Sequence, residues 1–212
     1  MGASDAGTPG IEPSLLDRAA RFSAATLHEA MGRRGALPAA IKPLDPRMRL
    51  LGPALPVSAP PFDNLTLHQA IYAARPGDVL VVEVAGAYEA GYWGEIMTCA
   101  ARPRGVAGLV IDGCVRDGAL IAEMGFPVFA RGLAIRGTAK AGGGRIGEPI
   151  AIGGVVVAAG DLVVGDGDGV VVVPRAELAR VLDEADRREE KERRVKAALA
   201  AGRTTLDIYG WR

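Results

Sequence analysis

The sequence lacks features that mark several classes of protein, such as cysteine motifs and an excess of charge. It contains only two cysteines, Cys99 and Cys114, which form neither a CxxC pair nor a cluster with histidine. We therefore expect reduced thiols and a cytoplasmic location. The 25 basic and 25 acidic residues balance, so no excess of charge indicates nucleic acid or an anionic membrane as a partner.

Long apolar runs are also absent. No uncharged stretch reaches the roughly 20 residues that a membrane-spanning helix needs. The first residues, MGASDAGTPGIEPS, lack the basic region and apolar core of a signal peptide. Because they are small and polar, residues 1–13 are expected to form a mobile lead-in. Residues 14–212 are long enough for one sizeable core and are expected to form a single domain.

Two glycine-rich segments lack the residues that would make them ligand loops. No GxxxxGK[ST] pattern surrounds the triplet at 142–144, and Pro149 rather than a helix follows, which favours a flexible turn over a phosphate loop. Asp166 and Asp168 have the spacing of a calcium loop, but the other ligands and the closing glutamate are missing. The Asp-Gly steps between apolar runs predict a β-hairpin instead.

Strand and helix patterns alternate through the middle of the chain. Apolar runs at 79–84, 106–111 and 126–130 predict buried strands, with helical patterns at 95–101 and 119–124 between them. This order is typical of βαβ units with right-handed crossovers. The sequence therefore predicts an α/β fold.

Further elements flank this region. Helices are expected from Ser14, at 26–31 and at 64–71. Short strands at 48–52 and 54–57 lie among prolines, which favours positions near a sheet edge or at bends. A charged helix is expected from Pro174 to about Ala201, where glutamates stand four residues before arginine or lysine. The aromatic residues that follow it need covering, and packing against a partner is one way to cover them.

The stretch from Trp93 to Asp117 holds the first candidate site. Gly94 precedes a helix start, so the amides of Ile96 and Met97 are expected to be unpaired first-turn donors that suit a carboxylate.

Arg116 and Asp117 lie just beyond the strand at 106–111, near the end where ligands collect in open α/β sheets. An arginine can hold a carboxylate or a keto oxygen, and an aspartate can ligate Mg²⁺ or Mn²⁺. A loop ion pair or a helix cap is an equal alternative for Arg116 and Asp117.

Other polar residues are weaker candidates. Asn64 and His68 are four residues apart and share a helix face, which suits a ligand pocket. A surface or packed histidine is the alternative. Glu29 is expected to be a solvated helix residue or to point at a neighbour, and Glu192 is able to reach another subunit.

Several separated motifs resemble one family. They are Gly94-Glu95, GLVIDGCVRD ending at Asp117, Pro127-Val-Phe, and GDLVVGDGDGVVVV ending at Val173. Together they resemble the fold shared by RraA-like proteins and class II 4-hydroxy-4-methyl-2-oxoglutarate (HMG) and 4-carboxy-4-hydroxy-2-oxoadipate (CHA) aldolases. The resemblance spans nearly the whole chain after Ser14. It implies an RraA-like α-β-β-α sandwich with a central mixed sheet and a charged C-terminal helix.

The motifs DNLTLH, GTAK and LDIYG resemble the aldolase branch rather than the regulators of RNase E. The resemblance implies a pyruvyl-binding role for Arg116, metal binding by Asp117, and a catalytic role for Glu95 at a position usually acidic. It also implies trimers or hexamers with sites between subunits. Residues implied to line the distal, carboxylate-bearing half of the substrate are Asn64, His68, Thr138 and Lys140, and acidic residues at the edge of the site are Glu29 and Glu192.

The implied activity is divalent-metal-dependent retro-aldol cleavage of HMG or CHA to pyruvate plus pyruvate or oxaloacetate. The amides of Ile96 and Met97 would hold the substrate carboxylate, and Arg116 would stabilise the enolate. A water of the metal's shell, oriented by Glu95, would take the 4-hydroxyl proton. Decarboxylation of oxaloacetate is expected as a side activity because it passes through the same enolate.

Three alternatives stay open at this point. A Schiff-base aldolase would need a desolvated lysine, for which Lys140 or Lys42 is the candidate. A non-enzymatic RraA-like regulator of RNA degradation would release no pyruvate. A metal-dependent lyase acting on another 2-oxo acid would share the pyruvyl half of the site and differ in the distal half.

Overall fold

The structure is a computed structural model that describes residues 10–211. Residues 1–9 of the predicted lead-in therefore lie outside the described part of the chain. The helices are α1 (Pro13–Ala19), α2 (Ala24–Ala30), α3 (Leu65–Ala73), α4 (Glu95–Ala101), α5 (Gly118–Glu123), α6 (Leu178–Ala200) and α7 (Thr205–Tyr209), with short 3-10 turns at Arg102–Arg104 and Arg175–Glu177. The strands are β1 (Lys42–Pro43), β2 (Leu50–Ser58), β3 (Val79–Glu83), β4 (Gly108–Ile111), β5 (Cys114–Val115), β6 (Val128–Ala130), β7 (Gly132–Leu133), β8 (Arg145–Ile146), β9 (Ile150–Ile152), β10 (Val155–Val157), β11 (Leu162–Asp166) and β12 (Gly169–Val173).

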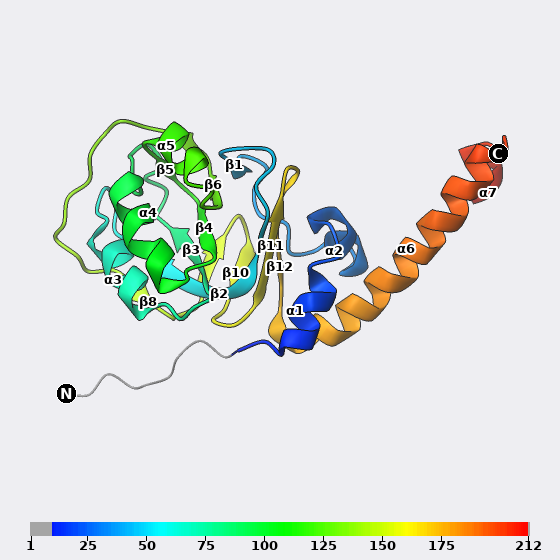
Figure 1. Ribbon diagram of the computed structural model, residues 1–212, viewed down its shortest axis with the longest axis horizontal. Coiled ribbons are helices and arrows are strands. Elements are labelled where there is room, and N and C mark those ends of the chain that lie inside the picture. The colour runs from blue at the N-terminus through cyan, green and yellow to red at the C-terminus, as the bar shows by residue number, and fades with distance from the viewer. Residues whose placement is uncertain (1–9, 212) are drawn as a thin grey trace.

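The main sheet is mixed and lies between two groups of helices. Its strand order is β1-β6-β4-β3-β2-β11-β12, with β8 also paired to β2. Strands β2, β3, β4 and β6 run parallel, and helices α3, α4 and α5 connect them in turn, as the predicted βαβ units require. Figure 1 shows α3, α4 and α5 on one side of the sheet and α1, α2 and α6 on the other. The α-β-β-α arrangement is confirmed.

The sheet curls until it is nearly closed. Phe129 of β6 and Gly165 of β11 lie on strands separated by β4, β3 and β2 in the strand order. Nevertheless, a Cβ atom added to Gly165 would lie 2.8 Å from the Phe129 ring. At the two ends of the sheet, the Lys42 side chain donates to the carbonyl of Asp168. The inside of the curl is filled by buried aliphatic side chains around Phe129.

The proline-containing strands were expected near a sheet edge or at bends, and the edge position is wrong. Residues 50–52 and 54–57 belong to one strand, β2, which lies in the middle of the sheet between β3 and β11. The part from Leu50 to Pro53 pairs with β11, and the part from Ala54 to Ser58 pairs with β3. Each part of β2 has one main partner strand. The missing N–H groups of Pro53 and Pro56 therefore interrupt hydrogen bonding on at most one side of the strand.

The predicted hairpin is confirmed at β11 and β12, where Asp166 pairs with Gly169 across a two-residue loop. The Asp166 carboxylate accepts hydrogen bonds from the amides of Asp168 and Ala24 at 3.0 and 2.9 Å. It therefore closes the hairpin and begins α2.

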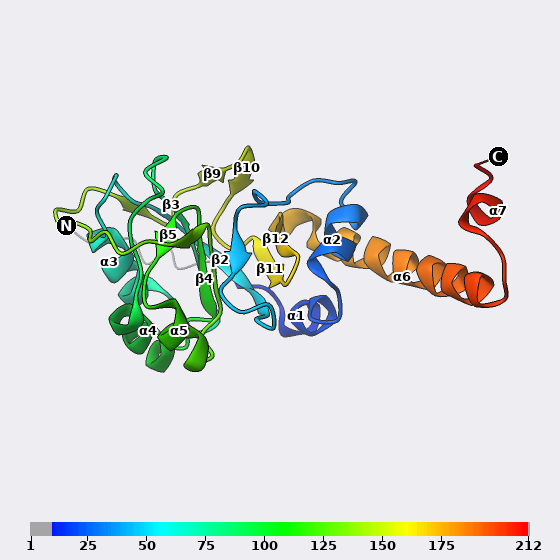
Figure 2. The ribbon, with the colours of Figure 1, turned by 90° about the horizontal axis from the view of Figure 1, so that it is seen from above.

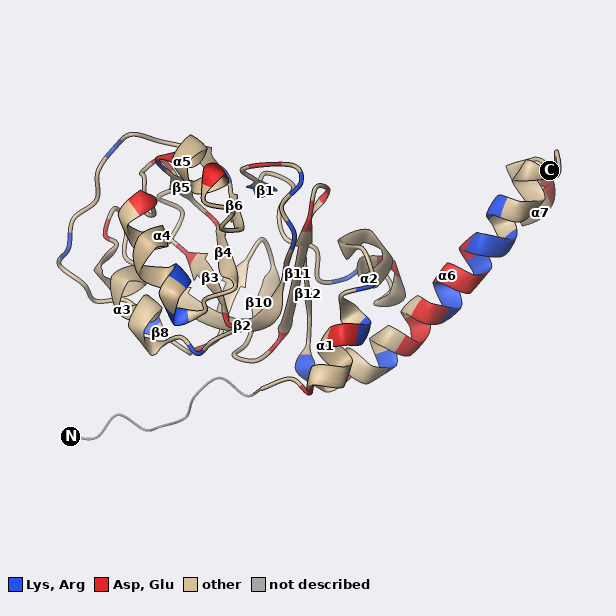
Figure 3. Ribbon diagram, in the orientation of Figure 1, with Lys and Arg blue, Asp and Glu red and all other residues tan. Residues whose placement is uncertain are grey.

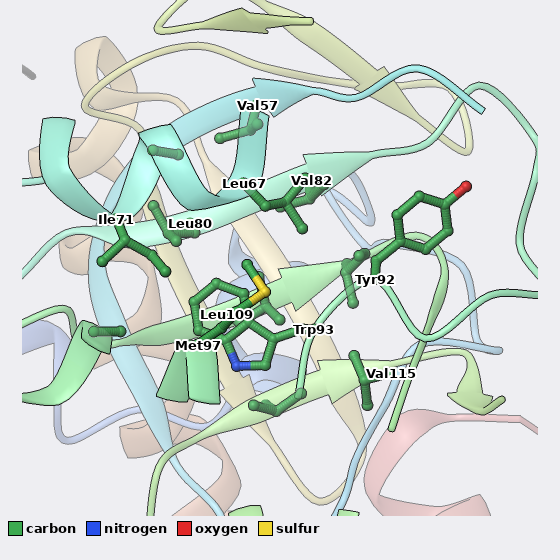
Figure 4. Packing of buried hydrophobic residues seen from close by; sticks show 14 of the residues in the cluster. Val57, Leu67, Ile71, Leu80, Val82, Tyr92, Trp93, Met97, Leu109 and Val115 are labelled. Atoms are coloured by element: carbon green, nitrogen blue, oxygen red, sulfur yellow. The ribbon is translucent and has the colours of Figure 1, made fainter. Parts of the chain in front are cut away.

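A second core lies between the parallel strands and the helices α3 and α4. Figure 4 shows Trp93 beside Met97 and Leu109 within this cluster. Trp93 is fully buried, donates through Nε1 to Thr98 Oγ1 at 2.8 Å, and stacks on Phe126 at a centroid distance of 6.0 Å. The segment that precedes α4 is thus held by a large buried side chain.

The predicted charged helix is confirmed as α6, and only its first part packs on the sheet. Its buried residues end at Ala185, and the remainder projects from the body with charges of both signs along it (Figures 2 and 3). Glu190 and Arg194 pair at 2.7 Å, and Arg188 and Glu192 at 3.0 Å. None of the helices between residues 10 and 211 has the length and apolar character that crossing a bilayer requires.

The curl of the sheet gives a stability prediction. Gly165→Ala would push a methyl group into the buried Phe129 ring, which cannot move far in a packed core. We expect a loss of about 1–3 kcal/mol in the free energy of unfolding, measured by denaturant titration. Gly137→Ala is the control, because a Cβ there meets no atom within 4 Å. Equal stability of the two variants would contradict the close contact between β6 and β11.

Candidate active site

The side chain of Arg116 lies against the backbone at two glycines. A Cβ on Gly91 would lie 3.0 Å from Arg116 Cβ and 2.7 Å from the carbonyl oxygen of Ala134. A Cβ on Gly94 would lie 2.6 Å from Asp117 Oδ2 and 3.2 Å from Arg116 Nε. Any larger residue at either position would move this arginine or its neighbours. The glycines therefore allow the start of α4 to approach Arg116 and Asp117.

Asp117 has an unusual backbone conformation and an unexpected partner. Its φ of 58° places it in the left-handed region, where aspartate is tolerated better than most residues. It immediately precedes α5 but does not cap that helix with its side chain. Its Oδ2 instead accepts the amide of Glu95 at 3.1 Å and lies 3.6 Å from Arg116 Nε. Of the two alternatives that the sequence left open, the ion pair is present and the cap of the following helix is not; the carboxylate binds the first amide of α4 instead.

A cavity of about 230 Å³ opens beside this pair. Every residue that was predicted to bind substrate lines it, although those residues come from four separate parts of the chain. Gly91, Trp93, Gly94 and Gly137 complete the lining and were not predicted as site residues. The full lining is Asn64, His68, Gly91, Trp93, Gly94, Ile96, Met97, Arg116, Gly137, Thr138 and Lys140. The pattern Gly91-Tyr-Trp-Gly94, two glycines around buried aromatics, is the signal that could have identified the first three.

Tyr92 connects the two sides of this site. Its backbone carbonyl accepts a hydrogen bond from Asn64 Nδ2 at 2.9 Å. Its hydroxyl accepts the amide of Phe62 at 2.7 Å and donates to the carbonyl of Ala87 at 2.8 Å. Burial raises the pKa of the phenol, so the hydroxyl keeps the proton that it donates. The start of α3 is thereby fastened to the segment that leads into α4.

The polar groups on the α3 side are poorly solvated. Asn64 is buried, and its Oδ1 is the one buried side-chain polar atom of residues 10–211 with no hydrogen-bond partner. An unpaired buried acceptor is costly, and a donor group on a ligand would satisfy it. Burial and the nearby charge of Lys140 lower the pKa of His68 below its ordinary value, so the ring is neutral at pH 7.

The first-turn amides of α4 provide donors on the other side. Among the described residues, no acceptor is found for the amides of Ile96 and Met97, whereas that of Thr98 bonds to the carbonyl of Gly94. This is the state expected for the beginning of a helix. The Ile96 side chain is largely exposed, and that of Met97 is buried.

Of the residues predicted to act in catalysis or metal binding, Arg116 lines the cavity, whereas Glu95 and Asp117 lie at its edge and do not line it. Asp117 lines an adjoining hollow of about 430 Å³ together with Arg116, Leu133, Ala134 and Ile135. Glu95 is half-buried and contributes its amide to Asp117. The two hollows share Arg116.

Asp117 fits a hard cation better than zinc. No group of three or more His, Cys, Asp or Glu side chains gathers anywhere in residues 10–211. One half-exposed carboxylate, with Oδ1 free of hydrogen bonds to the described residues, suits Mg²⁺ or Mn²⁺ that keeps water and substrate oxygens as its other ligands. It does not suit zinc, which takes several protein ligands.

The two acidic residues predicted at the edge of the site are elsewhere in this chain. Glu29 lies on α2 and Glu192 on α6, on the opposite side of the sheet from α3 and α4 (Figure 1). Both contact Arg188, at 3.4 Å from Glu29 and 3.0 Å from Glu192. Within one subunit they form a helix-to-helix ion network.

A larger hollow of about 400 Å³ lies between the first two helices and strands β2 and β11. Its charged residues already have structural partners. Arg21 pairs with Asp186, and Asp166 accepts two backbone amides. Size alone therefore does not make this hollow the better candidate for a ligand site.

Comparison with known proteins agrees with this fold. The RraA-like family, described as Aldolase/RraA, matches residues 15–172. A protein of Halalkalibacterium halodurans named "Putative 4-hydroxy-4-methyl-2-oxoglutarate aldolase" is 38% identical over 175 residues, covering 81% of this chain and 83% of that protein.

Solved structures show the same relationship. An uncharacterized protein from Pseudomonas syringae is 33% identical with a TM-score of 0.80, covering 92% of this chain and 96% of that one. RraAS2 of Streptomyces coelicolor, described as an unusual member of the RNase ES inhibitor RraA protein family, is 31% identical with a TM-score of 0.78, covering 88% and 98%. The chain belongs to the RraA-like family.

Proposed function

We propose that the protein is a divalent-metal-dependent aldolase that cleaves 4-hydroxy-2-oxo acids such as HMG and CHA. The observation that carries the proposal is one cavity that combines Arg116 and free helix amides with a second set of polar residues from α3 and the loop after β7. The named relative from Halalkalibacterium halodurans supports the same reaction class. Such a substrate has a 2-oxo acid at one end, which suits Arg116 and the helix amides. It has a second carboxylate at the other end, which suits the polar residues from α3 and the loop.

The pyruvyl half of the substrate would bind beside Arg116. The amides of Ile96 and Met97 would hold the 1-carboxylate, since both lack an acceptor among the described residues. Asp117 would hold Mg²⁺ or Mn²⁺, which when bound polarises the 2-keto oxygen. The Arg116 guanidinium would donate to the same keto oxygen.

Cleavage breaks the bond between C3 and C4. Its electron pair passes to C3 and is delocalised onto the 2-keto oxygen, where Arg116 stabilises the negative charge. The 4-hydroxyl loses its proton and becomes the carbonyl of the second product, and protonation of C3 gives pyruvate. We propose that Glu95, whose amide bonds to Asp117, orients the water that accepts the hydroxyl proton. Loss of CO₂ from oxaloacetate would leave the same enolate.

The distal half would lie among Asn64, His68, Thr138 and Lys140. Lys140 supplies a positive charge for the second carboxylate, and His68 and Thr138 supply hydrogen bonds. The unpaired Oδ1 of Asn64 would accept a hydrogen bond from a water bound beside the substrate. In the proposed trimer or hexamer, Glu29 and Glu192 would reach the site of a neighbouring subunit, because they lie away from the cavity of their own.

A second candidate function is inhibition of a ribonuclease, as in the family to which RraAS2 is assigned. Such a protein has no need of a reactive arginine or a metal. A lyase acting on another 2-oxo acid would keep the Arg116 side of the cavity and use the distal side differently.

The first test is release of pyruvate in a coupled assay with HMG, CHA and oxaloacetate. We expect activity with Mg²⁺ or Mn²⁺ and its loss with EDTA, because Asp117 alone cannot polarise the keto group. Borohydride treatment with substrate should trap no adduct on Lys140 or Lys42. Absence of pyruvate release with either metal would overturn the aldolase proposal and favour the inhibitor.

The second prediction concerns the enolate. Arg116→Lys keeps the charge but removes the planar fork of donors. We expect kcat with HMG to fall about 10²- to 10³-fold, the usual effect of losing an oxyanion donor. His68→Ala should mainly raise KM. Equal and small changes in kcat for both variants would count against the role of Arg116.

The third prediction follows from the lowered pKa of His68. The ring is neutral at pH 7 and gains its proton only as the pH falls through a pKa below 6.5. A charged ring attracts the distal carboxylate, so KM for HMG should fall about tenfold as the pH drops below 6.5. His68→Gln keeps a hydrogen-bond donor that does not titrate. If this variant shows the same pH dependence, another group is responsible.

A further inference from the structure

We infer that Asp63 is a positioning residue that clamps the loop carrying Thr138 and Lys140 onto the start of α3, which carries Asn64 and His68. Asp63 does not line the cavity. Its catalytic consequence rests on the proposed function, but the clamp itself can be tested separately.

The Asp63 carboxylate accepts three backbone amides. Its Oδ1 accepts from Leu65 at 3.0 Å and from Gly142 at 3.2 Å, and its Oδ2 accepts from Ala141 at 2.5 Å. The residue is only 4% exposed. The bond from Leu65 begins α3, whereas the other two bonds join that helix start to a loop far along the chain.

Backbone hydrogen bonds continue this junction toward the cavity. Ala139 donates to the carbonyl of Phe62 at 2.7 Å and accepts from the amide of Asn64 at 3.1 Å. Lys140 is therefore flanked by two residues, Ala139 and Ala141, that are both tied to residues 62–64. The clamp therefore fixes the backbone from which the Lys140 side chain extends.

Other contacts hold the two ends of this loop: the carbonyl of Arg136 accepts the amide of Gly91 at 2.8 Å, and the amide of Gly144 donates to Thr66 Oγ1 at 3.2 Å. Its middle depends on Asp63 and on the backbone bonds of Ala139. Residues 134–144 contain no helix or strand, and most of them are exposed. Glycines stand at 137 and at 142–144, and those at 142 and 143 have φ values of 80° and 100°. Such a segment loses much conformational freedom when it becomes ordered. Hydrogen bonds to a buried charge are strong enough to offset part of that loss.

A carboxylate is the group that this junction requires. Although burial raises the pKa of Asp63, the amides of Leu65, Ala141 and Gly142 and the charge of Lys140 together hold it below its ordinary value. The group is therefore ionised at neutral pH and offers acceptors on both oxygens. An asparagine would turn an NH₂ group toward one of these amides, so that donor would face donor.

The clamp acts on one half of the site. Arg116 lies against Gly91 and Gly94. The loop meets Gly91 through Ala134 and the carbonyl of Arg136, which precede the residues 141 and 142 that Asp63 holds. Loosening the loop should therefore weaken binding of the distal carboxylate and spare the chemistry of the pyruvyl half. Pyruvate by itself forms the same enolate, so exchange of its methyl protons with deuterated water reports on that half alone.

The test compares Asp63→Ser and Asp63→Asn with the wild-type protein. A serine hydroxyl can still accept the amide of Leu65 two residues on, but it is too short to reach Ala141 and Gly142. Hydrogen–deuterium exchange of residues 134–144 should become faster in Asp63→Ser. The KM for HMG should rise about tenfold or more, as expected for lost hydrogen bonds to a charged group, while pyruvate methyl exchange stays within about twofold.

Asp161→Asn is the matched control. Asp161 is also buried, and it accepts the amides of Ala158 and Arg175, both at 2.9 Å, away from the cavity. It should lower stability without changing the KM or the exchange of residues 134–144. Asp63→Asn serves as the second variant if Asp63→Ser does not fold.

Unchanged protection of the loop in the Asp63 variants, or an equal loss of HMG cleavage and pyruvate exchange, would overturn the inference. If the wild-type protein acts on neither HMG nor pyruvate, the proposed function fails, and loop protection alone then decides whether the clamp exists.

Discussion

The site depends on the close approach of Arg116 to the backbone at Gly91 and Gly94. This approach is possible only because neither residue has a side chain and because the segment between them cannot move. Tyr92 and Trp93 prevent that movement: both are fully buried, and their polar atoms are hydrogen-bonded within the protein. Two aromatic side chains in the core thus hold a short buried stretch of backbone in place, and the arginine packs against it.

The same segment links the two sides of the cavity. The carbonyl of Tyr92 holds the amide of Asn64, and its hydroxyl holds the amide of Phe62. Through these residues, the beginning of α3 takes its position from the core beneath α4. The loop after β7 is attached last, by Asp63 and by the backbone of residues 62–64. The cavity is therefore assembled from a rigid side around Arg116 and a more weakly held side around Lys140.

The remainder of the fold contributes in a different way. The hairpin β11–β12 closes the curled sheet and supports α1, α2 and the first turns of α6. The outer part of α6 carries paired charges and reaches away from the body (Figure 3). Glu29 and Glu192 belong to this side, so they are separated from the cavity of their own chain by the sheet.

The sequence by itself determined the elements whose pattern is local. Apolar runs, glycine breaks and charge spacing predicted the strand at 79–84, the helix at 95–101, the hairpin and the charged last helix. The residues of the cavity were identified from the family motifs. The tertiary structure alone shows that β2 is central despite its prolines. The residues of β2 do not reveal that its pairing changes from β11 to β3 along the strand. The tertiary structure alone shows that Asp117 binds the first amide of α4 rather than capping α5, and that Asp63 bonds to a loop. Those bonds join residues far apart in the chain, and no local pattern specifies which amide a carboxylate will meet.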